Sequence, residues 1–303
     1  MSVRTAIFAL VLAASLVGGA AVGAATFLQE TRPAGTPPPT RIDLGRSRDP
    51  ILVGAGDIAE WPPGARGRDE ETADLLDAIV RKKRGRVTVF TAGDNAYDSG
   101  LTSEYASYYT PTWGRYKAIT RPAPGNHEYY SKGAAGYFRY FGVRPYYAYD
   151  LGAWRVYSLN SEVPHQAGSP QERWLRRDLT AHPRHCVMAY WHRPRYSAGP
   201  HGSDASMQAL WQALADHHAD VIVSAHDHDY ERYAPRDRIR EFVVGTGGNY
   251  LYPFTRSLAG IVARSDHTWG VIVFTLHRAG YDFRFIPVAG QDYRDRGSFA
   301  CSN

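Results

Sequence analysis

The chain has 303 residues, of which 44% are hydrophobic and 21% are charged, a composition typical of a globular protein with a substantial core. Its 35 lysines and arginines are interspersed with 30 acidic residues, which gives a formal net charge of +5 and no block of like charge. This pattern argues against a nucleic-acid-binding arm and indicates a solvated surface with a weak attraction for anions.

The first 28 residues have the pattern of an export signal. Arg4 is the only charged residue before the uncharged stretch over residues 6–28, and small residues crowd the end of that stretch, as signal-peptidase cleavage requires. We therefore expect residues 1–28 to be a signal peptide. The alternative is an uncleaved signal anchor, because about 20 apolar residues can span a bilayer. Either form makes the protein secreted or extracytoplasmic in the cell envelope, with membrane contact only if the leader is uncleaved.

A Pro-rich segment follows the leader. Residues 29–50 cannot build a core and are predicted to be a linker, so that the folded domain covers residues 51–303. The sequence has two cysteines, Cys186 and Cys301. In an exported protein they could form one disulfide, and two free or buried thiols are an equally good interpretation.

Alternating strand and helix patterns fill most of the domain. Short apolar, β-rich runs predict strands at residues 51–54, 87–91, 156–159, 186–191 and 221–224. Amphipathic stripes predict helices around residues 75–80, 171–179 and 207–215. Three later strand runs, at residues 242–244, 271–276 and 281–288, have little helix between them. This order predicts an α/β sandwich, with sheet packed on sheet and helices outside.

Nearly every predicted strand ends in a polar cluster. These clusters supply Asp57, Asp94, Tyr97, Asn126, His127, His192, His226 and His228. Ligands in open α/β sheets bind at the carboxyl ends of strands, so we expect these side chains to converge on one site. A two-metal site needs a bridging carboxylate together with imidazole and oxygen donors, and this set contains them. It contains no cysteine, which argues against a structural zinc–thiolate site.

An aromatic segment over residues 129–149 interleaves tyrosines with basic residues. It has two interpretations, the lining of a substrate cleft or the packing of a hairpin and a sheet edge. Packing is the simpler interpretation of the two.

Five short motifs occur in a fixed order: G-D (56–57), G-D-N-A-Y (93–97), G-N-H-E (125–128), a lone W-H (191–192) and H-D-H-D-Y-E-R (226–232). In this order they resemble the motifs of calcineurin-like metallophosphoesterases and, within these, of the purple acid phosphatases. The resemblance covers residues 51–248. It implies a four-layer α-β-β-α sandwich of two mixed sheets, with a binuclear metal site at the carboxyl ends of the strands.

The resemblance also implies the metal ligands. It assigns the first ion to Asp57, Asp94, Tyr97 and His228, and the second to Asp94, Asn126, His192 and His226, with Asp94 bridging. Ala59 stands where many members of the family carry a ligating histidine, and Tyr97 would replace that ligand. Because phenolate is a hard donor, the resemblance implies Fe(III) at the Tyr97 position and Fe, Zn or Mn at the other.

Four histidines carry the remaining expectations. In extended backbone, residues two apart face the same way, so His226 and His228 should point into one site. His127 matches the active-site histidine of the family and is the first candidate for a general acid. His201 matches the region where purple acid phosphatases present further histidines that contact phosphate. Hydrolysis would follow attack by a hydroxide generated at the metal pair.

The predicted function is therefore that of an exported phosphoric ester hydrolase, acid phosphatase-like, that acts on phosphomonoesters. A phosphodiesterase or nucleotide hydrolase with the same metals is the alternative. A catalytically silent envelope-binding protein is less compatible with a complete ligand set. The expected partner is a phosphate ester, with no nucleic acid polymer, and the sequence does not indicate an oligomeric state.

Overall fold

The computed structural model describes residues 42, 44–45, 47–59 and 67–302. The predicted leader, residues 1–28, and most of the predicted linker lie outside these residues. Within the part of the chain that is described, no helix is both long enough and apolar enough to cross a membrane. Ile42 and Leu44, which belong to the predicted linker, are buried against the hydrophobic core. The side chain of Lys82 binds the carbonyl of Ile42.

The first sheet has six strands: β1 (Ile51–Ala55), β2 (Val87–Ala92), β3 (Thr120–Ala123), β11 (Gly270–His277), β12 (Gly280–Pro287) and β13 (Asp295–Ala300). Their order in the sheet is β13-β12-β11-β1-β2-β3. Strands β1, β2 and β3 pair in parallel, so their carboxyl ends lie at one edge of the sheet. Strands β11, β12 and β13 extend the sheet as antiparallel hairpins.

The second sheet has seven strands: β4 (Tyr147–Leu151), β5 (Trp154–Ser158), β6 (Cys186–Tyr190), β7 (Val221–Ser224), β8 (Tyr230–Tyr233), β9 (Arg240–Val244) and β10 (Ile261–Ser265). Their order is β10-β8-β9-β7-β6-β5-β4. The central strands β5, β6, β7 and β9 are parallel. Strands β4, β8 and β10 add antiparallel pairs toward the two edges.

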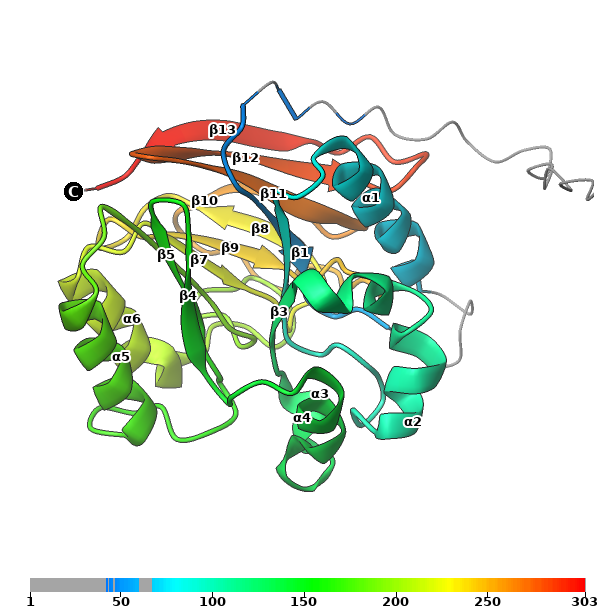
Figure 1. The fold of residues 1–303 in the computed structure, drawn as a ribbon, viewed down its shortest axis with the longest axis horizontal. Coiled ribbons are helices and arrows are strands. Elements are labelled where there is room, and N and C mark those ends of the chain that lie inside the picture. The colour runs from blue at the N-terminus through cyan, green and yellow to red at the C-terminus, as the bar shows by residue number, and fades with distance from the viewer. Residues whose placement is uncertain (1–41, 43, 46, 60–66, 303) are drawn as a thin grey trace, which may run out of the picture. The chain divides into compact units, whose positions relative to one another are not determined.

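Three longer helices cover the outer faces of the sheets: α1 (Asp69–Lys82), α5 (Pro170–Ala181) and α6 (Gln208–Asp216). Three shorter helices lie in the connections that follow β2 and β3: α2 (Thr102–Glu104), α3 (Asn126–Tyr129) and α4 (Ala135–Phe141). The buried stripe of α1 contains Leu75, Leu76 and Ile79. Helix α5 begins where the side chain of Ser169 accepts a hydrogen bond from the backbone of Glu172, with proline at the first helical position. Figure 1 shows α1 on the side of the first sheet and α5 and α6 on the side of the second.

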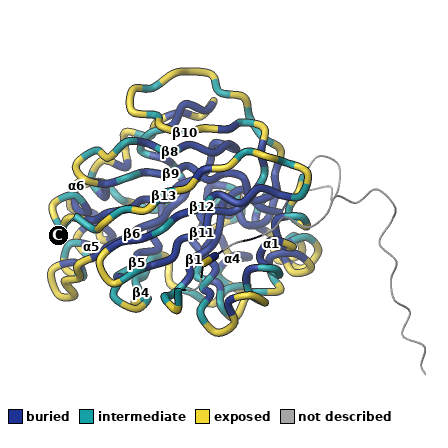
Figure 2. Tube along the Cα trace, turned by 90° about the horizontal axis from the view of Figure 1, so that it is seen from above, coloured by how far each residue is buried: buried dark blue, intermediate teal, exposed yellow. Residues whose placement is uncertain are grey.

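Side chains that alternate along the strands make two cores. On β6, Met188 and Tyr190 face the core between the sheets, whereas Val187 and Ala189 face α5 and α6. Phe242 of the second sheet packs on Phe274 of the first, with ring centroids 5.5 Å apart. The central strands are accordingly buried along most of their length (Figure 2). The predicted sandwich of two mixed sheets with helices outside is confirmed.

A disulfide joins the two sheets. Cys186 on β6 is bonded to Cys301, which follows β13, with their Cα atoms 5.5 Å apart. The structure thus selects the disulfide from the two interpretations of the cysteines. The aromatic segment over residues 129–149 runs from the end of α3 through α4 to the edge strand β4. Strand β4 forms an antiparallel hairpin with β5, in agreement with the packing interpretation of this segment, whereas helix α4 was not predicted.

Candidate metal centre

The candidate site lies where the parallel strands of both sheets end. From the first sheet, Asp57 follows β1, Asp94 and Tyr97 follow β2, and Asn126 and His127 follow β3; from the second, His192 follows β6 and His226 and His228 follow β7. The structure therefore brings together residues that are up to 171 positions apart (57 to 228) at the carboxyl ends of five strands. All seven predicted ligands are buried.

One group of donor atoms surrounds the hydroxyl of Tyr97. This oxygen lies 2.8 Å from Oδ1 of Asp57, 3.2 Å from Oδ2 of Asp94 and 3.3 Å from Nε2 of His228. Nε2 of His228 lies 3.3 Å from Oδ1 of Asp57. These four residues are the set that the family resemblance implied for the first metal ion.

A second group surrounds Nε2 of His192. This nitrogen lies 3.1 Å from Oδ2 of Asp94, 3.1 Å from Oδ1 of Asn126 and 3.1 Å from Nδ1 of His226. Oδ2 of Asp94 is the oxygen that also contacts Tyr97. One carboxylate oxygen therefore belongs to both groups, as a bridging ligand requires.

The donor atoms fit metal ions in spacing and in type. Metal–ligand bonds of about 2.0–2.2 Å place neighbouring donors roughly 2.8–3.6 Å apart in octahedral or tetrahedral geometry, and the observed separations are 2.8–3.3 Å. Nδ1 of His192 bonds the carbonyl of Ala92 at 2.9 Å, and Nδ1 of His228 bonds that of Tyr250 at 2.6 Å. These bonds turn both Nε2 atoms toward the cluster, the arrangement typical of metal-binding histidines.

The electrostatics of the cluster also favour cations. Burial and the carboxylates of Asp57 and Asp94 raise the pKa of Tyr97 well above its ordinary value. Burial disfavours the charged form of His192, but Asp94 outweighs that effect and raises the pKa of His192 to about 10. Burial and the positive charge of His192 lower the pKa of His226. A bound cation would replace these protons and stabilise the phenolate.

Two glycines of the motifs have a steric reason. A Cβ atom on Gly93 would lie 2.5 Å from Nδ1 of His192, and one on Gly125 would lie 2.2 Å from Oδ1 of Asp94. Only glycine allows the loop after β2 to lie this close to His192 and the loop after β3 to lie this close to Asp94. The backbone of Asp57, Asp94 and His226 adopts the left-handed region, with φ of 57°, 49° and 72°.

The prediction that His226 and His228 lie on extended backbone is wrong. Strand β7 ends at Ser224, and His226 has φ 72°, so the segment is a turn rather than extended backbone. The turn directs His226 to the second donor group and His228 to the first. Asp227 between them points elsewhere, accepting hydrogen bonds from the backbone of His201 and Gly202.

The two predicted substrate-contacting histidines lie at the exposed side of the cluster. Nδ1 of His127 bonds the carbonyl of Asp98 at 2.6 Å, and its Nε2 lies 3.9 Å from Oδ2 of Asp94. Nδ1 of His201 lies 3.0 Å from Oδ1 of Asp227, and its ring centroid is 4.1 Å from that of His226. The structure thus places both beside the donor groups.

Three features of the site were not predicted. Buried Glu128 accepts hydrogen bonds from the backbone of Asp94 and Gly125, at 3.0 and 2.7 Å, and so ties the loop after β2 to the loop after β3. Arg193 places a guanidinium nitrogen 3.3 Å from Nε2 of His226. The ring of Tyr252 stacks on His228 with centroids 4.1 Å apart. Glu128 is the last residue of the G-N-H-E motif and Arg193 directly follows the W-H motif, and these positions are the signal that the sequence offered.

Comparison with known proteins identifies the family of this chain. The family model described as calcineurin-like phosphoesterase matches residues 51–230. The chain belongs to this family. The calcineurin-like phosphoesterase match covers β1 through the start of β8 and therefore includes all seven candidate ligands. It confirms the resemblance that the ordered motifs indicated.

Two curated relatives of this phosphoesterase come from Arabidopsis thaliana. Purple acid phosphatase 21 is 27% identical over 202 residues, which cover 57% of this chain and 44% of that protein. Purple acid phosphatase 15 is 26% identical over 172 residues, which cover 45% of this chain and 32% of that protein. The matched part of the chain thus spans less than half the length of either relative.

Solved structures share the fold. Purple acid phosphatase PPD1 from yellow lupin (Lupinus luteus) seeds is similar with a TM-score of 0.69 and 17% identity, over 88% of this chain and 55% of that chain. GAP50, the anchor in the inner membrane complex of Plasmodium, is similar with a TM-score of 0.67 and 13% identity, over 84% of this chain and 90% of that chain. At these identities the similarity concerns the fold alone.

Proposed function

We propose that the protein is an exported, metal-dependent phosphatase that hydrolyses phosphomonoesters at a binuclear centre. The observation that carries this proposal is the position of Oδ2 of Asp94, within 3.2 Å of Tyr97 in one donor group and 3.1 Å of His192 in the other. A pair of cations held there would neutralise a phosphate ester and supply a nucleophile at neutral pH. The hard oxygen donors around Tyr97 favour iron(III) at that position, with Fe, Zn or Mn at the second.

His127 is the proposed proton donor to the leaving group. Its Nδ1 is held by the carbonyl of Asp98 at 2.6 Å and lies 3.1 Å from the Asp98 carboxylate. These contacts orient the ring and leave Nε2 on the side of Asp94, where a substrate oxygen would lie. An imidazolium so oriented can give its Nε2 proton to an alkoxide that leaves phosphorus.

His201 and Arg193 are proposed to bind the phosphoryl oxygens. His201 is oriented by Asp227, which is itself fixed by the backbone of Gly202. Arg193 is paired with Glu162 at 2.8 Å, which holds its guanidinium beside His226. Both side chains carry N–H donors suited to phosphate.

Two observations support export. The uncharged leader over residues 6–28 has the composition of a signal sequence. The disulfide between Cys186 and Cys301 belongs to an oxidising compartment, because thiols stay reduced in the cytosol. Cleavage of the leader would make the protein secreted, whereas retention would anchor it to the membrane.

Two other functions are compatible with the fold. A diesterase would use the same donor groups, and comparison of p-nitrophenyl phosphate with bis(p-nitrophenyl) phosphate distinguishes it by the preferred substrate. A silent binding protein is the second alternative, because GAP50, the anchor in the inner membrane complex of Plasmodium, has a similar fold. The complete set of donors argues against this second alternative.

The test is the substitution Asp94→Asn, which keeps the shape of the side chain but removes the charge that both donor groups share. We expect monoesterase activity to fall by about 100-fold or more and elemental analysis to show fewer metal atoms per chain. Asp74→Asn on α1, where the side chain is 72% exposed, is the matched control. Full activity in Asp94→Asn would contradict the proposed centre.

A further inference from the structure

A second concave site lies away from the metal centre. A cavity of about 890 Å³ opens between β3 and β4, which are edge strands of the two different sheets. Its lining includes Lys117, Arg121, Phe141, Arg144, Tyr147 and Tyr149. None of these is a candidate metal ligand. The volume is in the range of sites that bind small organic molecules.

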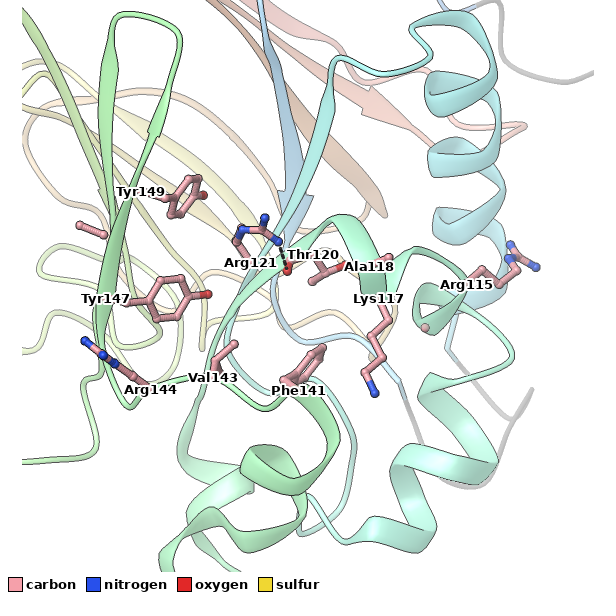
Figure 3. Close-up of a pocket in the computed structure, with 12 residues that line it drawn as sticks. Arg115, Lys117, Ala118, Thr120, Arg121, Phe141, Val143, Arg144, Tyr147 and Tyr149 are labelled. Atoms are coloured by element: carbon pink, nitrogen blue, oxygen red, sulfur yellow. Dashed lines mark hydrogen bonds between the residues drawn. The ribbon is translucent and has the colours of Figure 1, made fainter.

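Arg121 supplies the central charge of this cavity. Its half-buried side chain extends from β3, and Tyr147 and Tyr149 project toward it from β4 (Figure 3). The guanidinium carbon lies 5.9 Å from the ring centroid of Tyr149, and one nitrogen donates to the carbonyl of Thr120 at 3.1 Å. Among the described residues, no carboxylate forms an ion pair with Arg121, and the lining contains no acidic residue.

The tyrosines of the wall do not neutralise this charge. Burial raises the pKa of both Tyr147 and Tyr149, so their hydroxyls stay protonated at neutral pH. The hydroxyl of Tyr147 donates to the carbonyl of Pro122 at 2.8 Å, and that of Tyr149 lies 3.1 Å from the hydroxyl of Tyr190. A partly desolvated cation without a carboxylate calls for an anion from solution.

Two more cations line the rim. The exposed side chain of Lys117 lies 4.3 Å from the ring centroid of Tyr140, and Arg144 is exposed on the segment that precedes β4. Arg115 is different, because it points toward α1 and lies 3.4 Å from the carboxylate of Asp77. The charge available to a ligand therefore comes from Arg121, Lys117 and Arg144.

The rest of the lining is apolar and aromatic. Phe141 and Val143 form the wall below Arg121, and the rings of Tyr147 and Tyr149 form the wall beside it (Figure 3). Flat aromatic walls favour a planar ligand, because stacked rings gain contact without directional hydrogen bonds. An inorganic anion alone would leave most of this surface uncovered.

We propose that this cavity binds a planar aromatic anion, that is, a ring system bearing one phosphate, sulfonate or carboxylate group. The anionic group pairs with Arg121, and the ring lies against Tyr147, Tyr149 and Phe141. The site is independent of the metal centre, so its ligand is not required to be a phosphate ester.

Fluorescence titration with 8-anilinonaphthalene-1-sulfonate tests this proposal. This probe is a planar anion that a phosphatase does not cleave, and N-phenyl-1-naphthylamine is the same ring system without the sulfonate. We expect Arg121→Met to weaken binding of the sulfonate by about 10-fold or more, because a hydrogen bond to a charged group is lost. Binding of the neutral probe should stay unchanged. Arg177→Met on the exposed face of α5 is the matched control.

The outcomes separate clearly. Equal binding of the sulfonate to the wild-type chain and to Arg121→Met would overturn the proposal, as would equal loss of both probes. If Arg121→Met does not fold, as judged by circular dichroism, the double variant Lys117→Met/Arg144→Met replaces it. Both of its residues are exposed, and we expect it to weaken binding of the sulfonate alone. An unchanged affinity in that variant would overturn the proposal as well.

Discussion

Removal of the disulfide should destabilise the protein by an amount that follows from its position in the chain. Cys186 and Cys301 are 115 residues apart in sequence, and closure of a loop of this length in the unfolded chain corresponds to about 5 kcal/mol of stability at 25 °C. The bond also holds the end of β13, the edge strand of the first sheet, against β6 in the second. Other contacts hold this terminus, among them a hydrogen bond from the backbone of Ser302 to Asp220 at 2.6 Å, so we expect the fold to persist.

The assay is urea unfolding of the double variant Cys186→Ala/Cys301→Ala, followed by tryptophan fluorescence. Alanine is preferred to serine because Cys186 is fully buried, and a buried hydroxyl would add a separate penalty. With a urea dependence of about 3 kcal/mol/M, the midpoint should fall by about 1.7 M. A reducing agent should lower the midpoint of the wild-type chain by a similar amount and leave the variant unchanged. Equal midpoints for the wild-type chain and the variant would refute the reasoning.

Three further predictions concern the site and the core. Gly125→Ala should lower metal content and activity by about 10-fold or more, because its Cβ would lie 2.2 Å from Oδ1 of Asp94; full metal occupancy would contradict this. His127→Gln should lower kcat by about 100-fold with metal content unchanged, and a loss of metal would show that its role is not proton donation. Burial raises the pKa of Glu241 from 4.5 to about 8. Between these pH values the carboxyl of Glu241 is protonated in the folded state and ionised in the unfolded chain, so the free energy of unfolding should fall as pH rises from about 4.5 to about 8. Glu241→Gln should remove this contribution in urea unfolding at pH 5 and pH 8, and an equal pH dependence in both chains would exclude it.

The strands and the convergence of the site could be predicted because their signals are local. Strands β1, β2, β6 and β7 are short apolar runs, each followed within a few residues by a polar cluster, and sheet geometry brings the ends of such strands together. Strand β3, which reads T-R-P-A, lacks this signal and was not among the predicted strands. Helices α1, α5 and α6 each have an apolar stripe of helical period, as in Leu75, Leu76 and Ile79. The family match supports the order of the motifs, and the roles of the individual ligands stay predictions.

Features that depend on distant contacts could not be predicted. The turn at His226 depends on its backbone N–H, which donates to Oδ2 of Asp57 at 2.9 Å across 169 residues. The role of Glu128 depends on backbone donors from the loop after β2, which its own sequence does not reveal. Similarly, Arg121 belongs to the proposed anion site only because β4 of the other sheet brings Tyr149 beside it. Single-sequence patterns carry no information about such pairings.

At Asp57, Asp94 and His226 the left-handed backbone lowers the stability of the fold, while the side chain is a candidate metal ligand. A residue with a Cβ atom adopts this conformation at a cost of roughly 1 kcal/mol, and glycine would remove that cost. Glycine would also remove a candidate ligand. Selection of random variants for heat resistance alone, in medium without metal, should therefore enrich glycine at these three positions. The selected variants would keep the fold and lose candidate metal ligands.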